Sequence, residues 1–293
     1  FLEVATGKYS DAIASLLKTL SIQQAIDDKH PETVSTIMLL GKAYLLSQDY
    51  KNAEATLKDA IHKAETLLGK QHDHYAEVLY LIGMLYHQKG NPSKAEDYYY
   101  QSLTAYKSLY SKDPPKYVTA LNSLGELYQT HKQYAKAQVC FTQATQASKN
   151  LFVATTDYMS ERQRGLFWET IRHRYETIYP HFAYDSFKNN PNAAAFAYDN
   201  ELFLKGLLLH SSTSIHHSIA NSGDEQLIAQ WDSLKHMNVK ILALQENDPT
   251  SAYLVQLRQE AEALEKLLTV SSTIFRDNKQ TWKTTWKTVQ EAL

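Results

Sequence analysis

The sequence is poor in the features that mark several protein classes. Cys140 is the single cysteine among 293 residues, so no intrachain disulfide can form. The longest apolar run, Val78 to Tyr86, is nine residues and contains a glycine, whereas a bilayer-spanning helix needs about 20. The formal net charge of −2 gives no basic excess that could hold a phosphate backbone. These absences argue against a membrane partner and a nucleic-acid partner.

Glycine and proline are also scarce, at nine and seven residues. Both residues interrupt helices, so their scarcity predicts an all-α chain. Six of the prolines lie at or beside expected joints between helices: Pro31, Pro92, Pro114, Pro115, Pro191 and Pro249.

The chain opens on Phe1 inside an expected helix, and it shows no signal peptide. We therefore expect a piece cut from a longer protein, whose targeting information is missing. The compartment stays open. A cytoplasmic location is favoured, and a periplasmic one is compatible with a truncated N-terminus.

One short phrase occurs three times. Its glycine is followed each time, twelve residues later, by an alanine, and successive glycines are 42 residues apart. The three copies are Leu40-Gly41-Lys42-Ala43-Tyr44 with Ala53, Ile82-Gly83-Met84-Leu85-Tyr86 with Ala95, and Leu124-Gly125-Glu126-Leu127-Tyr128 with Ala137. Copies in register are the signature of a repeat protein, which outranks any single motif.

Each repeat reads as two helices. The first helix of the best-defined copy carries apolar residues at three- and four-residue steps: Val34, Ile37, Leu40, Gly41, Tyr44 and Leu45. Ser47 to Tyr50 breaks this pattern, and Ala53, Leu57 and Ala60 restart it. Gly41 and Ala53 would let the two backbones approach closely. Second helices are expected to begin near Tyr9, Tyr50, Pro92 and Tyr134, and the incomplete first unit supplies only such a helix, to about Asp27.

This pattern resembles the tetratricopeptide repeat, in a 42-residue form. Leu68 to Ala76 resembles the linker of kinesin-light-chain-like repeats. Ala120 to Leu124 resembles the short motif at the start of the first helices in those repeats. The resemblance implies a right-handed α-α superhelix over residues 1–150, with about three and a half repeats. First helices would line its concave face, which would bind a protein or peptide.

Projection of the helical period selects nine residues for that concave face: Met38, Lys42, Leu45, Tyr80, Met84, His87, Asn122, Glu126 and Gln129. The clamp that related repeats use for an acidic peptide C-terminus needs several lysines, arginines and asparagines. Lys42 and Asn122 suit it and Glu126 opposes it, so this mode is disfavoured. Asn122 is left with two alternatives, holding a peptide backbone through its amide or acting as an ordinary solvated residue.

Residues 151–293 continue the helical texture without the repeat and are expected to form a helical bundle extension. The first expected helix runs from Ser160 to about Tyr179, and Pro180 should end it. Three further helices are expected to begin near Asn190, Asp224 and Ser251. A last stripe comprises Trp282, Trp286, Val289 and Leu293.

Several phrases of this half resemble, in order, the region between repeats and protease in bacterial CHAT proteins. They are Leu151-Phe152, Ser160 to Gln163, Ala197 to Asp199, Phe203 to Leu209, and Ser222 to Asp224 with Trp231 and Leu234. The resemblance implies a non-catalytic recognition region ahead of a caspase- and separase-like protease domain beyond Leu293, which would itself be a partner. The alternative is an adaptor or sensor array that serves another output domain, such as a kinase.

No residue set predicts chemistry within the chain itself. Cys140 has no paired histidine in view and is expected to pack as a small apolar residue. The histidines around Asp73 (His72 and His74) and the cluster of His210, His216 and His217 lack a further ligand at recognisable spacing for zinc. We therefore expect no catalytic residue, no metal and no cofactor.

Overall fold

The computed structural model describes residues 7–27, 29–110, 114–156, 161–209, 219, 222–271 and 285–292. Every regular element in these ranges is helical, which confirms the all-α prediction. The chain forms two compact units, Phe1–Ser148 and Lys149–Leu293. Each unit is described by itself below.

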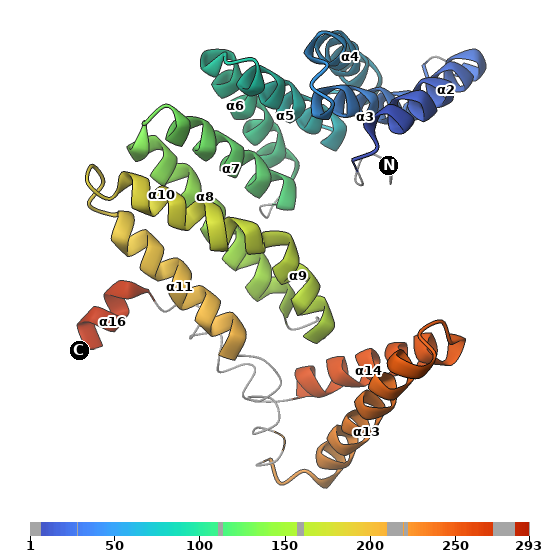
Figure 1. The fold of residues 1–293 in the computed structure, drawn as a ribbon, viewed down its shortest axis with the longest axis vertical. Coiled ribbons are helices and arrows are strands. Elements are labelled where there is room, and N and C mark those ends of the chain that lie inside the picture. The colour runs from blue at the N-terminus through green and yellow to red at the C-terminus, as the bar shows by residue number, and fades with distance from the viewer. Residues whose placement is uncertain are drawn as a thin grey trace. The chain divides into compact units, whose positions relative to one another are not determined.

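The first unit consists of helices that pack in pairs (Figure 1). Its elements are α2 (Tyr9–Asp27), α3 (Glu32–Leu46), α4 (Tyr50–Lys63) with the π-helical turn η1 (Ala64–Leu68), α5 (Asp73–Gln88), α6 (Pro92–Leu109), α7 (Pro115–Thr130) and α8 (Tyr134–Thr156), whose last residues belong to the second unit. The four second helices begin at Tyr9, Tyr50, Pro92 and Tyr134, as the sequence predicted.

The three repeated glycines lie where the two helices of a pair touch. A Cβ atom added at Gly41 would lie 2.6 Å from Leu57 Cδ2, and the second and third glycines meet Tyr99 and Phe141 at 2.6 and 2.5 Å. Carbon atoms do not approach this closely, so a larger residue would force the pair apart. The alanines at positions 53, 95 and 137 are fully buried. The predicted close approach of the two helices at the repeated glycines and alanines is therefore confirmed.

The turn inside each pair has the same backbone conformation. Gln48, Gly90 and Lys132 occupy equivalent positions and all have positive φ, at 63°, 70° and 57°. The amide after each of them donates to a carbonyl five residues earlier, at 2.8–2.9 Å, which satisfies an otherwise open helix end. Asp49 and Asn91 then cap the following helices through their side chains.

Neighbouring pairs are joined by a tyrosine–glutamate hydrogen bond that recurs with the repeat. The Tyr86 hydroxyl on α5 donates to Glu54 on α4 at 3.2 Å, and the Tyr128 hydroxyl on α7 donates to Glu96 on α6 at 2.6 Å. A hydrogen bond to a charged acceptor contributes more than a neutral one. These bonds couple each pair to the one before it.

Glu54 is the most strongly perturbed carboxyl group of this set. Hydrogen bonds from Lys58 at 2.8 Å and Lys89 at 2.5 Å lower its pKa from 4.5 to about 2. Lys89 lies on the next pair, so the ion pair reinforces the tyrosine bond.

The second unit contains α9 (Glu161–His173), the π-helical turn η2 (Arg174–Ile178), α10 (Tyr179–Ser186), α11 (Ala193–Leu209), α13 (Glu225–Asn247), α14 (Ala252–Ser271) and α16 (Trp286–Ala292). The predicted stop before Pro180 is wrong, because helix continues to Ser186. Pro180 falls in the first turn of α10, directly after η2. The π-helical turn interrupts the α-helical hydrogen-bond pattern directly before Pro180, and a residue without an amide hydrogen is tolerated at such an interruption.

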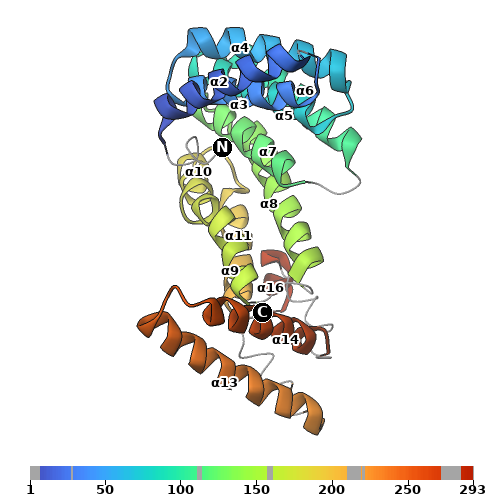
Figure 2. The same ribbon diagram turned by 90° about the vertical axis from the view of Figure 1, so that its right-hand side faces the viewer.

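Two cores hold this unit together. The first contains aromatic rings that pack edge to face, such as Tyr175 with Tyr179 at 5.1 Å and Tyr179 with Phe196 at 5.5 Å between ring centroids. The second lies between α13 and α14, which pack side by side (Figure 2). These are the helices expected from Asp224 and Ser251, and Leu234 and Leu257 are buried on them. Ser160 and Trp282 lie outside the described residues.

We expect Gly125→Ala to lower the free energy of unfolding by about 1–2 kcal/mol, because the clash with the Phe141 ring outweighs the gain in helix propensity. Gly165 on α9 is the matched control, since nothing lies within 4 Å of a Cβ added there. Gly165→Ala should raise stability by about 0.5–1 kcal/mol. Urea unfolding followed by circular dichroism measures both. Equal effects at the two glycines would contradict the close-contact argument.

A pH dependence follows from Glu54. Its pKa is lower in the folded chain, so its contribution is present above pH 4.5 and is lost as the pH falls towards 2. Glu54→Gln should cost about 1–2 kcal/mol at neutral pH, after allowance for solvent screening, and almost nothing at pH 2. Glu65→Gln is the control, because the Glu65–Lys70 pair is open to solvent and such exposed pairs contribute little to stability. A pH-independent loss at Glu54 would refute this assignment.

Candidate functional site

The nine residues expected on the concave face occupy three equivalent positions along the first helices α3, α5 and α7. The first position holds Met38, Tyr80 and Asn122, the second Lys42, Met84 and Glu126, and the third Leu45, His87 and Gln129. Their exposure differs from helix to helix, because each helix meets different neighbours.

Three of the nine residues are not at the surface. Met38 is 4% exposed, Leu45 is 0% exposed and Asn122 is 1% exposed. The expectation that they line a binding face is therefore wrong. A projection of a single helix takes no account of burial by neighbouring helices. In the structure α3 packs on α5, and α5 packs on α7.

Asn122 fits neither alternative considered from the sequence. Its amide nitrogen donates to the Val118 carbonyl of its own helix at 2.9 Å, inside the core. It is thus neither a solvated surface residue nor, in this structure, within reach of a peptide backbone. A buried amide is tolerated because it is hydrogen-bonded.

The other six residues are partly exposed and form what we call the candidate surface: Lys42, Tyr80, Met84, His87, Glu126 and Gln129. They supply one ammonium, one carboxylate, one amide and a central group with aromatic, thioether and imidazole side chains. Partner binding by these residues stays a prediction.

The centre of the candidate surface rests on a buried tyrosine. Tyr99 of α6 is 1% exposed, and its ring lies 5.9 Å from that of Tyr80 and 6.4 Å from that of His87. The Tyr80 hydroxyl lies 3.2 Å from the Ser123 hydroxyl on α7, within hydrogen-bonding distance. Rings held in this way form a rigid base that can accept an apolar side chain.

The central group carries no charge at neutral pH. Burial lowers the pKa of His87, and the nearby His131 lowers it further, so the imidazole is neutral. Burial also raises the pKa of Tyr99 above its ordinary value. Charge on the candidate surface is therefore confined to Lys42 on α3 and Glu126 on α7.

Sequence reasoning missed the role of Tyr99. The sequence did contain a signal for it. Tyr99 is at the same repeat position as Leu57 and Phe141, and all three residues contact the glycines that recur every 42 residues. Ser123 had no such signal, since its role depends on contact between two neighbouring pairs.

A group of potential metal ligands lies at the start of α5. Ligand atoms of Asp73, His74 and Glu77 lie within 4.8 Å of one another, and Glu77 supplies the further carboxylate that the sequence spacing did not reveal. Lys116 of α7, however, donates to Asp73 and, at 2.7 Å, to Glu77. Its ammonium occupies the position a cation would take, so these residues do not fit a metal.

The same lysine controls the charge state of Asp73. Burial alone would raise the pKa of this carboxyl, but hydrogen bonds from Lys116 and Tyr110 outweigh it and lower the pKa. His72 caps α5 by accepting from the His74 amide at 3.1 Å. The group is thus a structural ion pair at the start of a helix. The second histidine cluster, at 210–217, lies outside the described residues.

Cys140 packs in the core of the first unit at 5% exposure. Burial raises the pKa of its thiol to about 12, which keeps it protonated and unreactive at neutral pH. This buried position agrees with the expectation that Cys140 packs as a small apolar residue.

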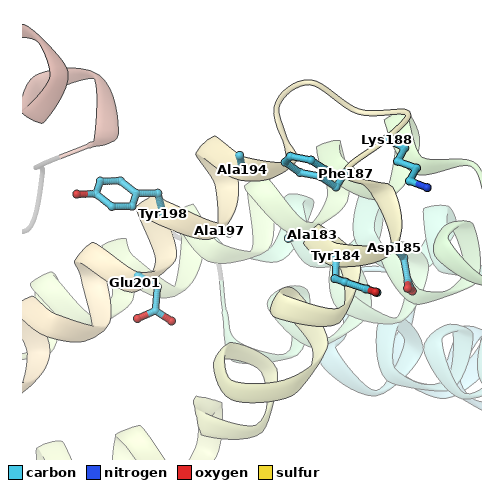
Figure 3. A pocket seen from close by; sticks show the side chains of 9 residues that line it. All are labelled: Ala183, Tyr184, Asp185, Phe187, Lys188, Ala194, Ala197, Tyr198 and Glu201. Carbon is cyan, nitrogen blue, oxygen red and sulfur yellow. The ribbon is translucent and has the colours of Figure 1, made fainter.

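The second unit has a hollow of about 720 Å³ between α10 and α11. Figure 3 shows Tyr184 and Asp185 from α10, Tyr198 and Glu201 from α11, and Phe187 on the connecting loop. The lining has neither a cysteine nor a histidine, so it offers no nucleophile–base pair of the cysteine-protease type.

Comparison with known proteins agrees with the repeat. Residues 1–65 and 61–108 match one tetratricopeptide-repeat model and residues 118–151 match another. None of the curated proteins compared with the chain matches its sequence. No helix in the described ranges is long and apolar enough to cross a bilayer.

Two solved structures are similar at low identity. One is BtubC (BKLC) from P. vanneervenii, 15% identical, with 89% of this chain and 92% of that one covered and a TM-score of 0.49. The other contains nearly identical TPR-like repeats of a Podosopora anserina kinesin light chain, 14% identical, with 71% and 88% covered and a TM-score of 0.47.

Residues 1–108 and 118–151 account for the three complete helix pairs and the additional helix α2 described above. Repeats of this type are generally non-catalytic and generally bind proteins or peptides. Residues 1–108 and 118–151 of the chain therefore carry tetratricopeptide repeats, a repeat type that generally serves protein–protein interaction.

Proposed function

We propose that the candidate surface binds a segment of a partner protein, and that the chain is the non-catalytic recognition region of a bacterial CHAT-type protein. The observation that supports binding is the row of partly exposed side chains at equivalent positions of α3, α5 and α7. The ordered phrases of residues 151–234 support the CHAT context.

The centre of the surface is suited to an apolar or aromatic anchor. Tyr80, Met84 and His87 are adjacent on α5, and the buried Tyr99 ring packs against Tyr80 and His87. Such a base is ordered before the ligand arrives, so little conformational entropy is lost on binding. Methionine and tyrosine are also the residue types that adapt to and anchor a partner.

The ends of the surface carry opposite charge. Lys42 lies on α3 and Glu126 on α7, with the neutral group of α5 between them. A ligand with an apolar centre, an acidic flank and a basic flank would match this order. A ligand with an acidic C-terminus alone would find one ammonium and no accessible asparagine amide, since Asn122 is in the core.

Selection of a displayed random-peptide library on the 293-residue chain tests the binding proposal, with affinities of the selected peptides measured by fluorescence anisotropy. We expect Met84→Ala and His87→Ala to weaken binding at least about 10-fold, because they remove the central contacts. His62→Ala, at an exposed histidine of the second helix α4, is the matched control and should change nothing.

Asn122→Ala separates burial from binding in the same assay. It should lower stability and leave affinity of the folded protein unchanged, because the amide is enclosed. Selected peptides that are insensitive to Met84 and His87 would remove the candidate surface.

The CHAT context has its own test, which does not depend on the peptide assay. The reading frame beyond Leu293 should encode a protease domain with a histidine–cysteine pair. A histidine-kinase core there would favour the adaptor alternative, and any other domain would reject the CHAT assignment. The isolated chain should show no peptidase activity in either case.

A further inference from the structure

Helix α13 of the second unit has two faces with different environments. Its inner face packs on α14, with Leu234 buried and Trp231 and Ile241 partly buried. Among the described helices, α14 is the one against which α13 packs extensively (Figures 1 and 2). The side of α13 away from this contact therefore faces solvent.

A regular stripe runs along the exposed side. Lys235, Val239, Leu242 and Glu246 follow one another at steps of four, three and four residues, and all four are exposed. Val239 is 67% exposed and Leu242 is 63% exposed, so two neighbouring aliphatic side chains on one helix face are in water. This spacing is that of a heptad seam, which typically packs against a second helix.

The stripe is complementary to itself when one copy is reversed. Its two apolar residues are central, and its ends carry opposite charges. In an antiparallel pair about a two-fold axis, Val239 meets Leu242 of the second copy, and Lys235 meets Glu246 of the second copy. A parallel pair would instead place ammonium on ammonium and carboxylate on carboxylate. Charge complementarity therefore selects both the partner and its direction.

A local ion pair keeps the lysine on the seam. Lys235 Nζ lies 2.7 Å from Asp232 Oδ1 one turn earlier on the same helix. Asp232 stands at the next heptad step, so this contact lies along the stripe. The contact limits the positions that the exposed ammonium takes along this face.

We propose that the exposed stripe of α13 is the contact between two copies of this chain, which pair as antiparallel helices. The apolar part of the seam is short, with two residues from each copy. The dimer is accordingly weak and reversible, well below the size of a permanent interface.

Sedimentation equilibrium of the 293-residue chain tests this proposal. With increasing concentration the average mass should rise from 33.5 kDa towards twice that value, at concentrations up to roughly 1 mM, the weak end of the affinity scale. Leu242→Glu should abolish the rise, because two carboxylates would face the apolar centre. Circular dichroism verifies that this variant remains folded.

Charge reversal distinguishes this seam from any other self-contact. Lys235→Glu should weaken the dimer about 10-fold, because two exposed ion pairs become repulsive, and addition of Glu246→Lys should restore it. Lys240→Glu, an equal charge change at an exposed residue off the stripe, is the control and should have no effect. A chain that stays monomeric, a dimer that survives Leu242→Glu, or a double variant that is not restored would each overturn the proposal.

Discussion

The first unit depends on the contact between a glycine and the side chain that covers it. Gly41, Gly83 and Gly125 leave the space that Leu57, Tyr99 and Phe141 fill. The covering residue differs in size from pair to pair, but the absent side chain is constant, so each pair can close to a similar distance. Similar pairs stack with a similar offset, and equivalent positions on α3, α5 and α7 then fall in a row. The candidate surface exists because of this regularity.

The stacking of one helix pair on the next needs a second interaction, because contacts within a pair do not fix its position relative to its neighbour. The tyrosine–glutamate bonds supply it between neighbouring pairs, and the lysines around Glu54 strengthen the first of them. A lysine ammonium also lies 4.8 Å from the ring centroid of each tyrosine. The stability of one pair thus includes a contribution from the pair before it, as is typical of repeat proteins.

The sequence was sufficient for the period, the helix starts and the buried glycines, because these follow from residue size and spacing within one pair. It was insufficient for Met38, Leu45 and Asn122, because their burial depends on neighbouring elements that a single-helix projection omits. Pro180 was misjudged because a π-helical turn places it where a proline is allowed. Lys116 and Glu77 are distant in sequence, so no spacing rule could have shown that they share a site.

The turns at Gln48, Gly90 and Lys132 have a consequence for how such an array can change over generations. Each turn satisfies its helix end through one left-handed residue and one fixed amide–carbonyl bond. An insertion or deletion of a single residue there would break that bond and leave the helix end unsatisfied. Gain or loss of a whole repeat leaves every such turn intact, so duplication of the gene segment is a step by which this lineage could widen or shorten the surface it offers.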